Sequence, residues 1–78
     1  MPQTKEQIIN IISQAEVVPD ASTLRDNINL SDQGVDSLGM FNIILSIQDH
    51  YVIEIPDEDI EGLKTINDLA DYIKSKLQ

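Results

Sequence analysis

One serine stands out among the residues of this sequence that could do chemistry. Ser37 directly follows Asp36, where a loop marked by Gly34 gives way to an apolar segment with helical spacing. Unpaired amides at the start of a helix, together with the positive end of its dipole, stabilise an anion. The position therefore suits a serine that carries a phosphate or a phosphodiester. The simpler alternative is that Asp36 caps the helix and Ser37 is only its first residue.

The sequence offers no other arrangement with the geometry of a catalytic centre. It has no cysteine, and its one histidine, His50, follows Ser37 on the same predicted helix. At about 1.5 Å of rise per residue the two side chains would lie roughly 20 Å apart, too far for a nucleophile and its base. The acidic run at 57–59 lacks the ligand spacing of a calcium loop. We therefore expect a protein that is not an enzyme and holds no metal.

Charge narrows the choice of partners. The chain has 14 acidic and five basic residues, which give a net charge of −9. Nine carboxylates and no lysine or arginine lie between Asp26 and Leu63. The resulting negative potential disfavours nucleic acids and anionic membranes as partners, and it favours proteins with basic patches.

Length and hydropathy predict one small domain over residues 1–78. No apolar run approaches the roughly 20 residues that a membrane span requires, and the N-terminal residues lack the apolar core of a signal peptide. We therefore expect a cytoplasmic protein without a membrane span.

Apolar periodicity predicts that helices position these residues. The first helix is expected over 4–16, capped by Thr4 and followed by Pro19. Residues 17–35 form a long loop, whose apolar members should anchor it to the core. These members are Leu24, Ile28, Leu30 and Val35.

Three more helices are expected in the second half of the chain. One begins at Asp36 or Ser37 and runs to about His50, a short one begins near Pro56 and ends near Gly62, and a last one is capped by Thr65. The last helix should bury one apolar row, composed of Ile66, Leu69, Ala70, Ile73 and Leu77. The alternating run at 51–55 has no partner strand, so it is expected to be an extended link. The predicted fold class is all-α, with three longer helices and one short helix.

The second helix is apolar around most of its circumference. One row holds Leu38, Phe41 and Leu45, and another row holds Met40, Ile44, Ile47 and Tyr51. Such a helix must be covered on more than one side or must offer part of its surface to a partner. Gly39 is unexpected here, because glycine inside a helix costs about 1 kcal/mol relative to alanine.

Three motifs in this order resemble the acyl carrier protein family. They are DSL at 36–38, IEIPDED at 53–59 and TxxDL at 65–69. The resemblance implies a four-helix, monomeric carrier in which a phosphopantetheinyl transferase esterifies Ser37 with 4′-phosphopantetheine from coenzyme A. It also implies that Asp36 helps to position the metal and substrate of that enzyme. The thiol of the arm would carry acyl groups as thioesters for ligases and synthases of fatty acid, lipid or polyketide biosynthesis.

The resemblance also implies a partner surface on the second and third helices. Its expected members are Leu38, Met40, Asn42, Ile43, Asp49, Asp57, Glu58 and Glu61. Fatty-acid carriers typically have several acids along the second helix, but here Gly39, Asn42 and Gln48 stand at such positions and Asp49 alone is acidic. This departure favours a specialised carrier with its own dedicated enzymes.

Three further questions stay open at the level of sequence. An acyl groove could be lined by six apolar residues, or the same residues could only pack against one another. They are Phe41, Ile44, Ile55, Ile60, Leu63 and Ile66. The cargo could also be an aminoacyl or a peptidyl group. A protein of another class would also explain the charge and the apolar second helix, namely an acidic helical adaptor without a prosthetic group.

Overall fold

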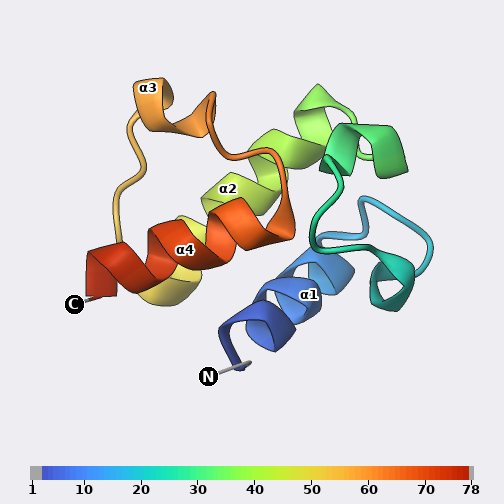
Figure 1. Ribbon diagram of the computed structural model, residues 1–78, viewed down its shortest axis with the longest axis horizontal. Coiled ribbons are helices and arrows are strands. Elements are labelled where there is room, and N and C mark those ends of the chain that lie inside the picture. The colour runs from blue at the N-terminus through green and yellow to red at the C-terminus, as the bar shows by residue number, and fades with distance from the viewer. Residues whose placement is uncertain (1–2, 78) are drawn as a thin grey trace.

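The computed structural model describes residues 3–77, and these fold into four α-helices and two 3₁₀ turns without any strand (Figure 1). The elements are α1 (Gln3–Ala15), η1 (Ala21–Thr23), η2 (Leu30–Gln33), α2 (Ser37–Tyr51), α3 (Asp57–Ile60) and α4 (Ile66–Leu77). The predicted all-α class is confirmed. None of the helices in this part of the chain has the length and apolar character needed to cross a membrane.

Helix α1 packs against both α2 and α4, while the short α3 lies apart from α1 at the far end of the molecule (Figure 1). The core between the long helices is dominated by isoleucine side chains with almost no exposed surface. They are Ile8, Ile11, Ile12, Ile43, Ile44, Ile47, Ile66 and Ile73. Stiff, β-branched side chains fill this space with little rotamer freedom to lose.

The two ends of α4 follow from local chemistry. The Asp68 amide donates to Oγ1 of Thr65 at 3.0 Å, and the Thr65 amide donates to Oδ2 of Asp68 at 3.2 Å. This reciprocal capping box confirms Thr65 as the cap. Lys74 and Lys76 lie in the last turn, where they complement the helix dipole.

The predicted buried row of α4 is correct for four of its members but wrong for Leu77. Ile66, Leu69, Ala70 and Ile73 are buried, whereas Leu77 is exposed. Leu77 occupies the last helical position, where α4 extends beyond the surface that its neighbours cover.

Left-handed residues end α1 and α2. Helix α1 starts at Gln3, one residue before the predicted cap Thr4, and ends at Ala15, because Glu16 adopts φ +56°. Helix α2 ends at Tyr51, one residue later than expected, because Val52 adopts φ +55°. Left-handed geometry is uncommon for a residue other than glycine, and it is strained for the β-branched Val52.

The long loop is anchored to the core, as predicted, but not by all four of its apolar residues. Leu30 and Val35 are buried and Leu24 packs against the core, whereas Ile28 is exposed. Near Ile28 the loop is held together by hydrogen bonds within the loop itself. The Gln33 side chain accepts from the Arg25 amide at 2.6 Å and donates to the carbonyls of Arg25 and Ile28, both at 2.9 Å.

Residues 53–55 between α2 and α3 form neither helix nor strand, so the run pairs with no strand, as predicted, while Tyr51 belongs to α2. Pro56 is the N-cap of α3, and three acids fill the first turn. Helix α3 is only four residues long and has no fully buried residue. A hydrogen bond from the Tyr72 hydroxyl to Oδ2 of Asp59, 2.7 Å long, ties α3 to α4.

Candidate functional site

Ser37 is the first residue of α2 and is exposed. Asp36, the N-cap, has extended backbone, and its Oδ1 accepts from the Gly39 amide at 2.7 Å. Among the described residues, neither the Ser37 hydroxyl nor the amides of Ser37 and Leu38 find a hydrogen-bond partner. The serine oxygen is therefore accessible, and free amides stand beside it to stabilise a phosphate.

The junction before Ser37 is held in place from both sides. Gly34 ends η2 with φ +101°, a geometry that glycine adopts without strain. The next residue, Val35, is buried, and its amide donates to the Leu30 carbonyl at 3.1 Å. The Leu30 amide in turn donates to the Lys64 carbonyl at 2.8 Å. These contacts fix the serine relative to both η2 and the segment before α4.

Close packing explains Gly39. A Cβ at this position would lie 3.1 Å from Oδ1 of Asp36, 3.2 Å from Cγ1 of Val35 and 3.3 Å from Cβ of Val17. Such distances are tighter than ordinary contacts, so glycine lets the first turn of α2 sit against the loop and keep the Asp36 cap without displacing these neighbours.

The sequence predicted this arrangement, an exposed serine at a capped helix start that follows an anchored loop. Comparison with known proteins shows which family has it. Residues 6–73 match the family described as "Phosphopantetheine attachment site". The chain belongs to the acyl carrier protein family.

Individual acyl carrier proteins match almost the whole chain. The meromycolate extension acyl carrier protein of Mycobacterium tuberculosis is 35% identical over 78 residues, which cover 95% of this chain and 68% of that protein. The acyl carrier protein of Bdellovibrio bacteriovorus is 36% identical over 66 residues, 85% of this chain and 83% of that one. The solved structure of the acyl carrier protein from Enterococcus faecalis has a TM-score of 0.72 and 30% identity, and covers 94% of this chain and 92% of its own.

Family membership establishes 4′-phosphopantetheine as the cofactor and a phosphopantetheinyl transferase and synthases as the kinds of enzyme with which this carrier interacts. The residues around Ser37 fit the group. The Ser37 hydroxyl is exposed, so it could receive the group, and the first-turn amides of α2 would be available to its phosphate. Because the chain has no cysteine, the thiol that holds a thioester must come from the cofactor.

The outward face of α2 is apolar next to this serine. Leu38, Phe41 and Leu45 are 67%, 50% and 47% exposed and follow one another at helical spacing. Leu45 was not among the predicted partner residues, although it lies in the same apolar row. The sequence contains the row but does not say which of the two rows of α2 faces the core.

Most of the predicted partner residues are exposed. Besides Leu38, the exposed members are Asn42, Asp49, Asp57, Glu58 and Glu61, while Met40 is half-buried. The prediction for Ile43 is wrong, because this side chain is fully buried in the core. One residue further along, Ile44 is also buried, so the inner face of α2 is wider than a single row.

The six residues predicted to line an acyl groove separate into two groups. Ile44, Ile55, Leu63 and Ile66 lie together in the core, and Ile60 packs against it. Phe41 does not join them, because half of its side chain is exposed on the outer face of α2. The prediction for Phe41 is therefore wrong in its geometry.

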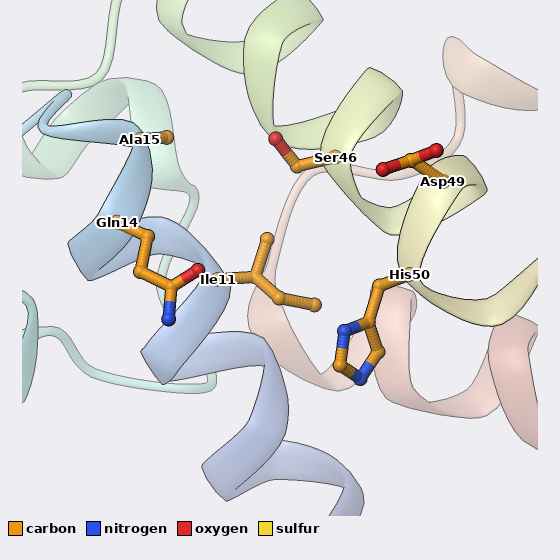
Figure 2. Close-up of a pocket in the computed structure, with 6 residues that line it drawn as sticks. All are labelled: Ile11, Gln14, Ala15, Ser46, Asp49 and His50. Carbon is orange, nitrogen blue, oxygen red and sulfur yellow. The ribbon is translucent and has the colours of Figure 1, made fainter.

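A cavity of about 300 Å³ lies between α1 and α2, away from the serine. Figure 2 shows Gln14, Ser46, Asp49 and His50 around the central Ile11, with Ala15 at one side. Ser46 follows Ser37 by two and a half helical turns, so it points to the opposite side of α2. This cavity therefore does not take part in the chemistry at Ser37.

A smaller cavity of about 200 Å³ lies beside the first turn of α2. Its lining comes from three segments that are distant in sequence: Asn29, Ser31, Met40, Leu63 and Lys64. Sequence reasoning missed Asn29, Ser31 and Lys64 as candidate binding residues. No motif marks them, because they meet only where the Leu30 amide reaches the Lys64 carbonyl.

Proposed function

We propose that Ser37 carries the phosphopantetheine arm and that the chain presents acyl intermediates, held as thioesters, to enzymes of lipid biosynthesis. The observation that carries the proposal is the exposed serine at the start of α2, directly after its Asp36 cap. The cofactor supplies the thiol that holds the acyl group. A relative named for meromycolate extension supports a lipid pathway over a polyketide one.

Asp36 and α2 supply the local chemistry for attachment. Oδ1 of Asp36 caps the helix, which holds Ser37 at the tip of α2 and aims the free amides toward the incoming phosphate. The other carboxylate oxygen of Asp36 would remain available to the metal of the transferase. No described histidine lies within reach of Ser37 as a base, so catalysis belongs to the partner enzyme and not to this chain.

The partner surface is proposed to be the outer face of α2 with the acids of α3. Leu38, Phe41 and Leu45 form its apolar centre, and Asp49, Asp57, Glu58 and Glu61 form its acidic edge. Since α2 itself contributes only Asp49, we expect its partners to depend on apolar contact more than partners of strongly acidic carriers do. We further propose a single domain that works as a cytoplasmic monomer with dedicated enzymes.

An acyl chain would enter the core beside α3. This helix is the least firmly packed wall of the core, because it is one turn long and has no fully buried residue. The hydrogen bond between Asp59 and Tyr72 ties it to α4. Ile44, Ile55, Leu63 and Ile66 would line the path, with Ile60 moving outward on α3.

The test is the intact mass after incubation with coenzyme A, Mg²⁺ and a broad-specificity phosphopantetheinyl transferase. The native chain should gain one phosphopantetheine, Ser37→Ala should gain none, and Ser75→Ala, at an exposed serine of α4, should behave as the native chain. A folded native chain that gains nothing would overturn the proposal and leave the protein as a carrier-like adaptor. Once the native chain has gained the arm, loading by acyl ligases or by amino-acid-activating enzymes distinguishes acyl from aminoacyl cargo.

A further inference from the structure

The segment 56–62, which contains α3, forms a flap between two fixed ends (Figure 1). At the first end Ile55 is buried, and its amide donates to Oε1 of Gln48 at 3.0 Å. At the other end Leu63 is buried, and the carbonyl of Lys64 accepts a hydrogen bond from the first residue of η2. Both ends are therefore held to the rest of the molecule, and only the residues between them have room to move.

Few contacts hold the flap itself in place. None of its residues is fully buried, and Ile60 is the hydrophobic side chain with which it packs against the core. The amides of Asp59 and Ile60 donate to the Pro56 carbonyl at 2.9 and 3.2 Å, so these hydrogen bonds stay within the flap. A single helical turn is not stable by itself. The flap therefore depends on its contacts with neighbouring elements.

One hydrogen bond joins the flap to another helix. The Tyr72 hydroxyl donates to Oδ2 of Asp59 at 2.7 Å, and both side chains are half-buried. No other hydrogen bond among residues 3–77 links 56–62 to a second helix or 3₁₀ turn. The Tyr72 ring packs against the core, and Nζ of Lys76 lies 5.4 Å from its centre. The fixed side of this hydrogen bond is thus α4, and its movable side is α3.

We propose that this hydrogen bond, the latch, holds the flap closed over the core and sets how often an acyl chain passes between the core and solvent. The inference rests on the proposed carriage of acyl groups. Tyr72 is then a positioning residue, which acts through the flap and does not touch the thioester. One hydrogen bond of ordinary net strength shifts such an equilibrium about fivefold, which regulates the flap without locking it.

Hydrogen exchange of the unmodified chain tests the latch without any arm or cargo. The Ile60 and Leu63 amides are hydrogen-bonded in the closed flap and should exchange when it opens, because a lone helical turn does not persist. Tyr72→Phe keeps the ring and loses the hydroxyl, so it should speed exchange at these amides about fivefold. Tyr51→Phe is the matched control, since the Tyr51 hydroxyl donates to Oε1 of Gln7 and joins α2 to α1. It should leave exchange in the flap unchanged.

Asp59→Ala removes the other half of the latch. It should speed exchange as much as Tyr72→Phe, and the double variant should exceed neither, because both changes break one interaction. Cleavage of the thioester by hydroxylamine then measures the effect on cargo in the modified carrier. Both variants should speed cleavage of an octanoyl thioester about fivefold. An acetyl group is too short to reach the core, so its cleavage should not change.

Three results would overturn the inference, each at a different step. Flap amides that exchange no faster in Tyr72→Phe than in Tyr51→Phe would exclude the latch. Additive effects of the Tyr72 and Asp59 substitutions would show two separate contacts instead of one. Faster exchange with unchanged octanoyl cleavage would overturn the control of cargo. A chain that gains no arm would overturn the proposed function instead, and exchange of the unmodified chain would still decide whether the latch exists.

Discussion

Helices α2 and α4 obtain their place in the fold in different ways. Helix α4 has one apolar row, a reciprocal cap at Thr65 and lysines in its last turn, so its start and its inner face follow from its own sequence. Helix α2 is apolar on nearly all sides, and its inner face is decided by what α1 and the loop cover. Apolar residues that lie exposed along one side of a helix mark an interaction surface, and partner binding is the role that we propose for the outer face of α2.

The largest expected effect on stability comes from substitutions on the inner face of α2, compared with substitutions on its outer face. Ile44→Ala should lower the free energy of unfolding by about 2–5 kcal/mol, because it leaves a cavity in the core, while Leu45→Ala, one residue further, should cost under about 1 kcal/mol. On α4, Ile73→Ala and Leu77→Ala should differ in the same way. Urea denaturation measures all four, and equal costs for Ile44 and Leu45 would contradict the assigned inner face.

A smaller effect tests the close packing at the start of α2. Gly39→Ala should lower the free energy of unfolding by about 1–2 kcal/mol, because the added Cβ crowds Asp36, Val35 and Val17. The energetic cost of this crowding should exceed the gain in helix propensity. Gly62→Ala is the matched control, because its Cβ would meet only the Asp59 carbonyl at 3.7 Å, an ordinary contact. Thermal unfolding compares the two, and a stabilised Gly39→Ala would disprove the packing argument.

The contact between α4 and α3 can be tested through the pH dependence of stability. Burial, together with the hydrogen bond to Asp59 and the charge of that residue, raises the pKa of Tyr72 to about 12 from an ordinary 10.0. Because the folded-state pKa is the higher one, this stabilisation is complete below pH 10 and is lost as the pH rises from 10 toward 12.

Tyr72→Phe should therefore cost about 1 kcal/mol at neutral pH, the net value of one hydrogen bond, and should flatten the alkaline loss of stability. Urea denaturation at several pH values between 8 and 12 measures both effects. An unchanged alkaline profile in the variant would assign that loss to other groups.

The smallest expected effect concerns the end of α2. Val52 holds φ +55° while 89% of its surface is exposed, so it has backbone strain and little packing to lose. Val52→Asn should stabilise by about 0.5–1 kcal/mol, since asparagine tolerates the left-handed region. A lower melting temperature for this variant would indicate that the Val52 side chain makes a contact that the exposure does not reveal.

The sequence alone was sufficient for most features that depend on neighbours in the chain, although the helix ends and the expected Thr4 cap were not among them. The helical periods, the Thr65 cap and the position of Ser37 after Asp36 all rest on spacings of a few residues, and the order of the DSL, IEIPDED and TxxDL motifs indicated the family. Local hydrogen bonds and helix geometry decide these features, so no distant contact had to be known.

Tertiary structure decided what lies inside and what lies outside. Whether Ile43 or Leu45 faces a partner, whether Phe41 belongs to the core, and whether Asn29 meets Lys64 all depend on which surfaces α1, η2 and α4 cover. A helix that is apolar all round has no periodic signal that distinguishes its two sides, and a cavity built from three segments has no signal in any one of them. Whether a side chain is buried depends on all the elements packed around it, so only the folded structure shows it.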